Sequence, residues 1–255
     1  MALRSWCGEV YEVSTNRYLI QMFKNPWLTF NPEEGAAKFH QSDLAFVQAF
    51  NNGMQSSGIK GKENYILAEH LEPFPYLGDR FANVLLLLAN PGKSEKEKKK
   101  TFNMDPEKVA QNRRNLRHED IDSIKSRIHS PANPEFESVW LKPRVRELVE
   151  QTSIDRVTKG LFLVNFHAYH SKSWQPIPFT FPTQHYSFYL VQEAIKREAL
   201  IIMSRNRLGW FTAVPELFEY RKETGNVVEF DSQRSVHMSK GNLSAKAFNK
   251  ILERL

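Results

Sequence analysis

Cysteine is almost missing from this sequence, and long apolar runs are missing altogether. Cys7 is the single cysteine, so the chain cannot close a disulfide on itself, which is typical of proteins from a reducing compartment. The longest apolar run, residues 84–89, is far shorter than the roughly 20 residues that cross a bilayer. No basic segment followed by an apolar one, the pattern of a secretory signal, begins the chain. We expect a cytoplasmic protein with no membrane partner.

Several short motifs for cofactor binding or nucleophilic catalysis are also lacking. The sequence has no Walker loop, no dinucleotide-binding glycine triplet and no Gly-x-Ser-x-Gly elbow of a serine hydrolase. His167 and His170 lie close to Asn165 and suggest a metal site, but no third ligand follows nearby, so phosphate contact or plain packing is the preferred interpretation. We expect neither a cofactor nor a metal.

Charges of both signs are present, with a moderate positive excess. Lys and Arg number 35 against 29 Asp and Glu, which gives a net charge of +6 and a pI near 9.3. This excess favours an anionic partner such as nucleic acid, although many enzymes carry as much.

A length of 255 residues suits one α/β domain, and we expect a monomer. Residues 1–80 are predicted to form an irregular and helical extension, packed on a core of residues 81–255. Within that extension, residues 39–50 could form a short helix, whereas Pro73, Pro75 and Gly78 mark a loop.

Four apolar runs, each closed by polar or turn residues, indicate buried parallel strands. They span residues 84–89, 161–164, 199–203 and 226–230. A continuous apolar run that a turn ends is typical of a central parallel strand. Helical patterns separate the runs, with start signals at Asp105, Thr183 and Ser244. We expect an α/β fold, a three-layer sandwich whose central four-stranded parallel sheet is flanked by helices.

The residues directly after each strand are the candidates for function, because ligands bind outside the carboxyl ends of the strands in such sheets. These residues are Asn90, Asn165, the pair Ser204-Arg205 and the segment around His237. None of them is a carboxylate, whereas ordinary glycoside hydrolysis uses two.

Three motifs together point to a family. An apolar strand ends in Asn90-Pro91-Gly92, a second ends in Leu163-Val164-Asn165, and a late segment holds the lone His237 before a C-terminal helix. In this order and on these elements, the motifs resemble the uracil-DNA glycosylase superfamily, nearest the mismatch-specific uracil and thymine branch by its Asn-Pro-Gly. The resemblance covers residues 81–255. It implies a DNA-binding hydrolase that removes uracil or a modified base without a cofactor.

The resemblance also implies a role for each matching residue. Asn90 would position the attacking water at the sugar carbon, and Pro91 and Gly92 would shape the turn against the flipped nucleotide. Asn165 would face the Watson–Crick edge of the base, with Phe166 beside it. His237 would stabilise negative charge on the departing base. Contacts to DNA phosphates would come from Lys93, Ser94, Arg205, Ser239 and Lys240.

Two departures from the family pattern keep other functions open. Asn90 cannot act as a general base, so catalysis would be slow or depend on a good leaving group. The family's late motif is usually His-Pro-Ser, whereas this chain has His237-Met238-Ser239. A protein on the same fold that binds nucleic acid or a nucleotide without cleavage is therefore the main alternative. A fold relative that acts on a small metabolite is the third.

Overall fold

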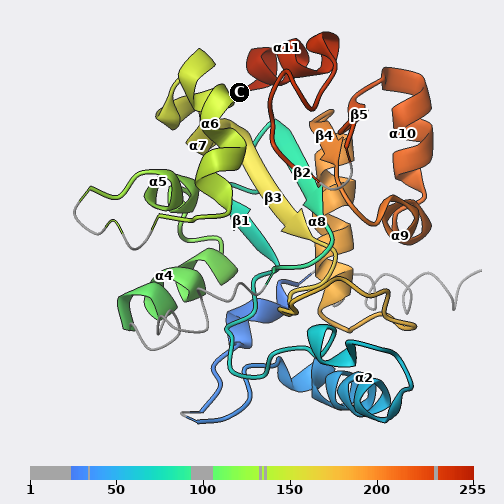
Figure 1. Cartoon of the computed structure of the whole chain (residues 1–255). Helices are drawn as coiled ribbons and strands as arrows, with labels where there is room; N and C mark the ends of the chain where they lie inside the picture. The colour runs from blue at the N-terminus through green and yellow to red at the C-terminus, as the bar shows by residue number, and fades with distance from the viewer. Residues whose placement is uncertain (1–23, 34, 93–105, 132–133, 135–136, 233–234) are drawn as a thin grey trace, which may run out of the picture.

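A computed structural model describes residues 24–33, 35–92, 106–131, 134, 137–232 and 235–255. Within these residues the chain forms a five-stranded mixed sheet with helices on both faces (Figure 1). The strand order across the sheet is β1-β3-β2-β4-β5. The strands are β1 (Tyr76–Gly78), β2 (Val84–Leu88), β3 (Leu161–Asn165), β4 (Leu200–Met203) and β5 (Val227–Glu229).

The prediction of a purely parallel, four-stranded sheet is wrong by one strand. The four predicted strands do run parallel to one another, but β1 pairs antiparallel with β3 at the sheet edge, where a loop was expected. Pro75 and Gly78 bound this strand closely, and three residues are too few to show the alternation that identifies a strand. At Gly78 φ is +97°, and a Cβ would lie 2.7 Å from the carbonyl oxygen of Leu161. Only glycine fits this position.

The two faces of the sheet carry separate apolar cores. Along β2, Leu85 and Leu87 face one core, whereas Val84, Leu86 and Leu88 face the other. Because both faces are covered, all five residues of β2 are buried, which explains why the run is apolar without alternation.

Helices from different parts of the chain complete each core. Side chains from α2, α4, α8, α9 and α10 pack on one face, and those from α5, α6, α7 and α11 pack on the other (Figure 1). The α-helices are α2 (Leu44–Ser56), α4 (Pro106–Leu116), α5 (Ser123–Ile128), α6 (Leu141–Gln151), α7 (Ile154–Gly160), α8 (Gln184–Lys196), α9 (Arg207–Ala213), α10 (Glu216–Thr224) and α11 (Ala245–Arg254). In the described part of the chain, no helix has the length and apolar character needed to cross a membrane.

Two of the predicted helix starts can be checked. Ser244 caps α11 as expected, because its hydroxyl oxygen accepts a hydrogen bond from the backbone N–H of Ala247 at 3.2 Å. Thr183 occupies the position before α8, but its side chain makes no capping bond and instead donates to Asp43. The predicted cap Asp105 lies outside the described residues.

Residues 24–75 pack at the end of the sheet where the parallel strands finish (Figure 1). They include the short helices η1 (Pro26–Thr29), η2 (Gln41–Asp43) and η3 (Lys62–Asn64), and the helix expected at residues 39–50 forms later, as α2. Backbone bonds join this segment to the loop after β3, from Ala68 N to His170 O at 2.9 Å and from Phe74 N to Ala168 O at 2.8 Å.

A buried carboxylate strengthens this junction. Asp43 has no exposed surface and accepts hydrogen bonds from the Tyr169 hydroxyl at 2.6 Å and from the backbone N–H and hydroxyl of Thr183 at 3.0 and 2.5 Å. Burial, the charge of Asp43 and the hydrogen bond to it raise the pKa of Tyr169, so the hydroxyl stays a donor. Asp43 thereby ties the first part of the chain to the start of α8.

Candidate functional site

The structure brings two of the predicted residues, Asn90 and Asn165, to neighbouring strand ends. In the parallel register of β2 and β3, Leu88 lies opposite Asn165. The pairing continues beyond the strands, because Phe166 N donates to Leu88 O at 3.0 Å and His167 N approaches Ala89 O at 3.4 Å. The turn that carries Asn90 therefore starts beside the segment that carries Asn165.

The side chain of Asn90 is held by the loop after β3. Its Nδ2 donates to the hydroxyl oxygen of Ser171 at 2.9 Å and to the carbonyl oxygen of Pro91 at 3.2 Å. Gly92 forms a parallel bridge with Ser171, which fixes the end of the Asn90-Pro91-Gly92 turn. His170 also contacts this turn, with Nδ1 at 2.8 Å from Gly92 O.

Asn165 is buried, with only 1% of its surface exposed. Its Nδ2 donates to the carbonyl oxygen of Phe74 at 2.8 Å. Because that oxygen can only accept, the amide must direct its nitrogen toward Phe74 and its Oδ1 elsewhere. Among the described residues no donor reaches Oδ1, although the atom is buried. An unpaired buried carbonyl oxygen costs about 1–3 kcal/mol, which a ligand N–H would recover.

Aromatic rings gather beside these amides. Phe166 makes edge contacts with Trp174 and Trp210, with ring centroids 6.2 and 5.0 Å apart. Trp174 is half-buried and stacks on His167 at 5.3 Å. The indole nitrogen of Trp210 donates to Leu88 O at 3.1 Å, which fixes that ring under the strand end. Flat apolar surfaces of this kind stack on nucleobases of any sequence.

The two histidines of this loop differ in their surroundings. His167 is buried, and burial lowers its pKa to about 3, with a smaller contribution from His170, so the ring is neutral and is not a cationic phosphate contact. His170 places Nδ1 against Gly92 O and Nε2 at 3.1 Å from Glu72 O. In the described residues, no group of three or more His, Cys, Asp or Glu side chains is arranged to hold a metal ion.

His237 is not joined to the two asparagines by any hydrogen bond in the described part of the chain. It lies in the segment between β5 and α11, and its backbone carbonyl accepts a bond from Asn242 Nδ2 at 3.2 Å. The neighbouring Met238 N donates to the carbonyl oxygen of Arg144 in α6 at 2.9 Å. The segment is therefore fixed against α6, and its predicted role on the departing base stays a prediction.

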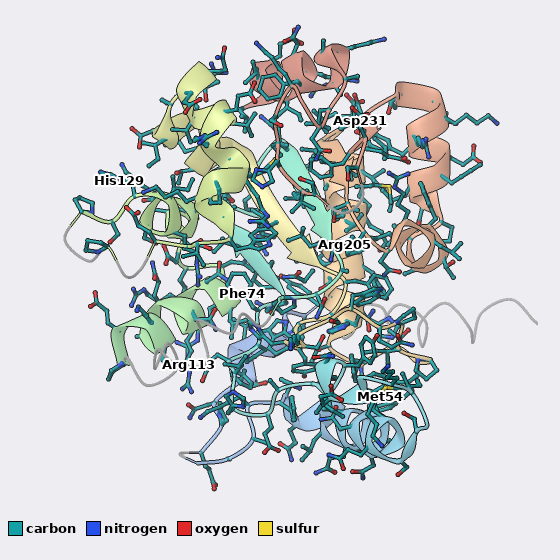
Figure 2. The ribbon with its side chains drawn as sticks, in the orientation of Figure 1. Met54, Phe74, Arg113, His129, Arg205 and Asp231 are labelled. Atoms are coloured by element: carbon teal, nitrogen blue, oxygen red, sulfur yellow. The ribbon has the colours of Figure 1, made fainter. Side chains whose placement is uncertain are left out.

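The predicted phosphate contacts are divided among several places. Arg205 follows β4 at the carboxyl edge of the sheet, the same edge as Phe74 (Figure 2). Burial and, to a smaller extent, the charge of Arg205 lower the pKa of Arg144, which places these two guanidinium groups in one neighbourhood. Lys240 instead packs its ammonium group over the ring of Phe248 in α11 at 5.7 Å.

Ser239 lies in the same segment as His237, and its N–H donates to His237 O at 3.0 Å. Lys93 and Ser94 lie outside the described residues. Sequence reasoning assigned no role to Ser171, Phe74 or Arg144. None of them belongs to a motif, so their positions beside the strand ends depend on tertiary packing that no local pattern predicts.

Two described carboxylates, Glu72 and Glu229, are in ion pairs. Glu72 pairs with Arg113 at 3.3 Å, and Glu229 contacts both Arg207 and Arg221, the latter at 2.7 Å. The arrangement at Asn90 and Asn165 can orient and bind polar groups, and Oε2 of the buried Glu72 has no hydrogen-bond partner among the described residues. No family model, no curated protein and no solved structure matches this chain.

Proposed function

We propose that this protein is a DNA glycosylase-like hydrolase that cleaves the N-glycosidic bond of uracil or a modified base in DNA. The observation that carries the proposal is the placement of Asn90 and the buried Asn165 at the ends of the neighbouring strands β2 and β3, where the oxygen of Asn165 meets no donor among the described residues. The aromatic faces of Phe166 and Trp174 beside them support the same conclusion.

The amide of Asn165 suits a base that has a ring N–H next to a carbonyl group. The N–H would donate to Asn165 Oδ1, which has no donor among the residues that the structure describes. The second hydrogen of Nδ2, which is not needed by Phe74, would reach the neighbouring base oxygen. Uracil and other bases with this edge satisfy both atoms, whereas a base with a ring acceptor at that position leaves two acceptors facing each other.

Asn90 would serve the sugar side of the reaction. A water that donates a hydrogen bond to Asn90 Oδ1 keeps a lone pair for the sugar carbon. As its oxygen bonds to that carbon, the C–N bond breaks and the electron pair leaves with the base. The water proton passes to solvent, because an amide has no basic lone pair to take it. The rate then depends on how well negative charge on the departing base is stabilised. His237 is the residue expected to stabilise it.

Access to the base would require extrusion from the duplex, which costs a few kcal/mol. Cationic groups at the same edge would hold the flanking phosphates, and Arg205, which follows β4 at that edge, is a described candidate. The net charge of +6 supports a polyanionic partner in a salt-dependent manner.

Binding without cleavage is the second candidate function. It is favoured because several described carboxylates already interact with other protein groups and are less suited to accept a proton. Glu72 and Glu229 are in ion pairs, and the buried Asp43 accepts hydrogen bonds. A protein with this site would hold an extruded or single-stranded base by stacking and by the amide of Asn165. It would release no base.

The test is an incision assay on oligonucleotides that carry uracil, a mismatched thymine or another modified base at one position, followed by alkali. We expect strand breaks at that position with the wild-type protein. Asn90→Ala and Asn165→Ala should each reduce the rate by about 10²–10³-fold, as expected for loss of a catalytic hydrogen bond. Asn52→Ala is the matched control, because Asn52 is exposed on α2 and should not affect the rate.

The outcomes separate the candidates. Salt-dependent binding that Asn165→Ala weakens, with no strand break in any substrate, would reject the hydrolase in favour of the binding protein. Neither binding nor product would reject both and leave an enzyme of small metabolites.

A further inference from the structure

We infer that Ser171 is a positioning residue that fixes the orientation of the Asn90 amide, so that Asn90 presents its oxygen and not its NH₂ group to the reacting water. The inference rests on the proposed function, because it assumes that Asn90 has a water to orient. Ser171 lies in the loop after β3, far from Asn90 in sequence, and only 3% of its surface is exposed.

The hydroxyl of Ser171 has a single proton, and this proton is used in a hydrogen bond to a backbone carbonyl oxygen. Ser171 Oγ donates to the carbonyl oxygen of Ser173 at 2.8 Å. Since a carbonyl oxygen cannot donate, Ser171 must be the donor in that bond. Toward Asn90, Ser171 therefore offers only a lone pair, and it accepts from Nδ2 at 2.9 Å.

Because Ser171 Oγ can only accept a hydrogen bond from Asn90, it restricts the orientation of the Asn90 amide. If the amide were flipped, Oδ1 would face the lone pair of Ser171 and the carbonyl oxygen of Pro91, with no proton between them. In the observed orientation, one hydrogen of Nδ2 goes to Ser171 and the other to Pro91. Both donors of the amide are occupied, and no described residue donates to Oδ1.

The orientation matters for the chemistry at the sugar. A water bound to an amide oxygen donates its proton and turns its lone pairs outward, toward an electrophilic carbon. A water bound to an NH₂ group does the reverse, because it uses a lone pair as the acceptor and directs protons outward. The same asparagine can thus promote or hinder attack, and the acceptors Ser171 Oγ and Pro91 O together decide which orientation it takes.

Further contacts hold the turn of Asn90 against the loop of Ser171. The parallel bridge between Gly92 and Ser171 and the contact of His170 Nδ1 with Gly92 O fix the turn on the same loop. His170 in turn contacts Glu72 O through Nε2 at 3.1 Å. The distance between Ser171 and Asn90 is therefore set by three separate contacts and does not depend on the side chains alone.

The first test is Ser171→Ala, measured as the single-turnover rate of base release and, separately, as the affinity for the oligonucleotide. Loss of one oriented hydrogen bond should lower the rate about five- to tenfold and leave the affinity unchanged. Ser171→Thr keeps the hydroxyl and should restore most of the rate. Ser173→Ala is the matched control, because Ser171 uses only the backbone oxygen of Ser173. Thermal melting checks that each variant is folded.

The second test removes the need for an orientation. In Asn90→Ala no amide is left for Ser171 to orient. Adding Ser171→Ala to Asn90→Ala should change the residual rate less than about twofold. If Ser171→Ala has the same five- to tenfold effect in both backgrounds, the serine acts only through general packing, and the inference is wrong.

A readout that does not depend on activity is the side-chain NH₂ signal of Asn90 in ¹H–¹⁵N NMR spectra, which Asn90→Asp assigns by its absence. Ser171→Ala should move this signal, and Ser171→Thr should leave it close to its wild-type position. An unmoved signal in Ser171→Ala overturns the inference even in an active enzyme. Conversely, a moved signal in a protein that cleaves no substrate supports the orienting contact while the proposed function fails.

Discussion

Acidification should destabilise this protein through His167, and the size of the effect follows from its burial. Burial lowers the pKa of His167 to about 3, compared with 6.5 for an ordinary histidine. Between these two pH values, His167 binds a proton in the unfolded chain but stays neutral in the folded chain. The stabilisation is therefore complete above pH 6.5, declines as the pH falls below that value, and is fully lost below about pH 3.

At pH 4.5, two units below the pKa of His167 in the unfolded chain, the contribution of His167 to the free energy of unfolding should be about 3 kcal/mol lower than at pH 7.5. Replacing His167 by Phe keeps a ring against Trp174 and removes the titrating group. The variant should lose stability at all pH values, because Tyr169 N no longer has the ring nitrogen it contacts at 3.3 Å. However, its decline between pH 7.5 and 4.5 should be about 3 kcal/mol smaller than that of the wild type.

The assay is urea unfolding followed by circular dichroism at the two pH values. His185→Gln is the control, because the His185 side chain is exposed, so the decline should match that of the wild type. An equal decline in His167→Phe and the wild type would refute the assignment of His167 as a buried neutral ring.

Three further predictions concern stability and are measured by urea or thermal unfolding. Asp43→Ala leaves three buried donors without an acceptor and should cost about 3 kcal/mol, whereas an unchanged midpoint would show that the junction is not anchored there. Gly78→Ala should cost about 2–4 kcal/mol, because its Cβ would lie 2.7 Å from Leu161 O at a positive φ. By contrast, Gly53→Ala, where the space is open in the last turn of α2, should stabilise by about 0.5–1 kcal/mol. Ser244→Ala should cost about 1 kcal/mol through the lost cap of α11, and no loss would contradict that cap.

The sequence was informative where a single physical cause sets the pattern. Burial of both sheet faces made the run at β2 continuously apolar, and the polar Asn90 that follows marked the strand end. The cap at Ser244 is equally local, since its partner Ala247 is three residues away. Features of this kind need no knowledge of the rest of the chain.

The misses share a different cause, which is dependence on a distant partner. Thr183 looked like a helix cap, but its hydroxyl donates to Asp43, 140 residues away. Ser171 looked like one more loop serine, and its relation to Asn90 exists only because β2 and β3 are paired. Likewise, β1 is defined by its antiparallel pairing with the distant β3, and no period within three residues could reveal it.

The contact between Asn165 and Phe74 has a consequence for any shortened version of the protein. Phe74 belongs to the first third of the chain, so a fragment that begins at residue 81 would strip the buried amide of its one hydrogen-bond acceptor and would also remove β1, the edge strand beside it. Such a fragment would retain every motif residue but lack the Phe74 carbonyl group that orients the Asn165 amide. The edge of the sheet that holds Asn90 and Asn165 is assembled from both halves of the polypeptide, and neither half forms it alone.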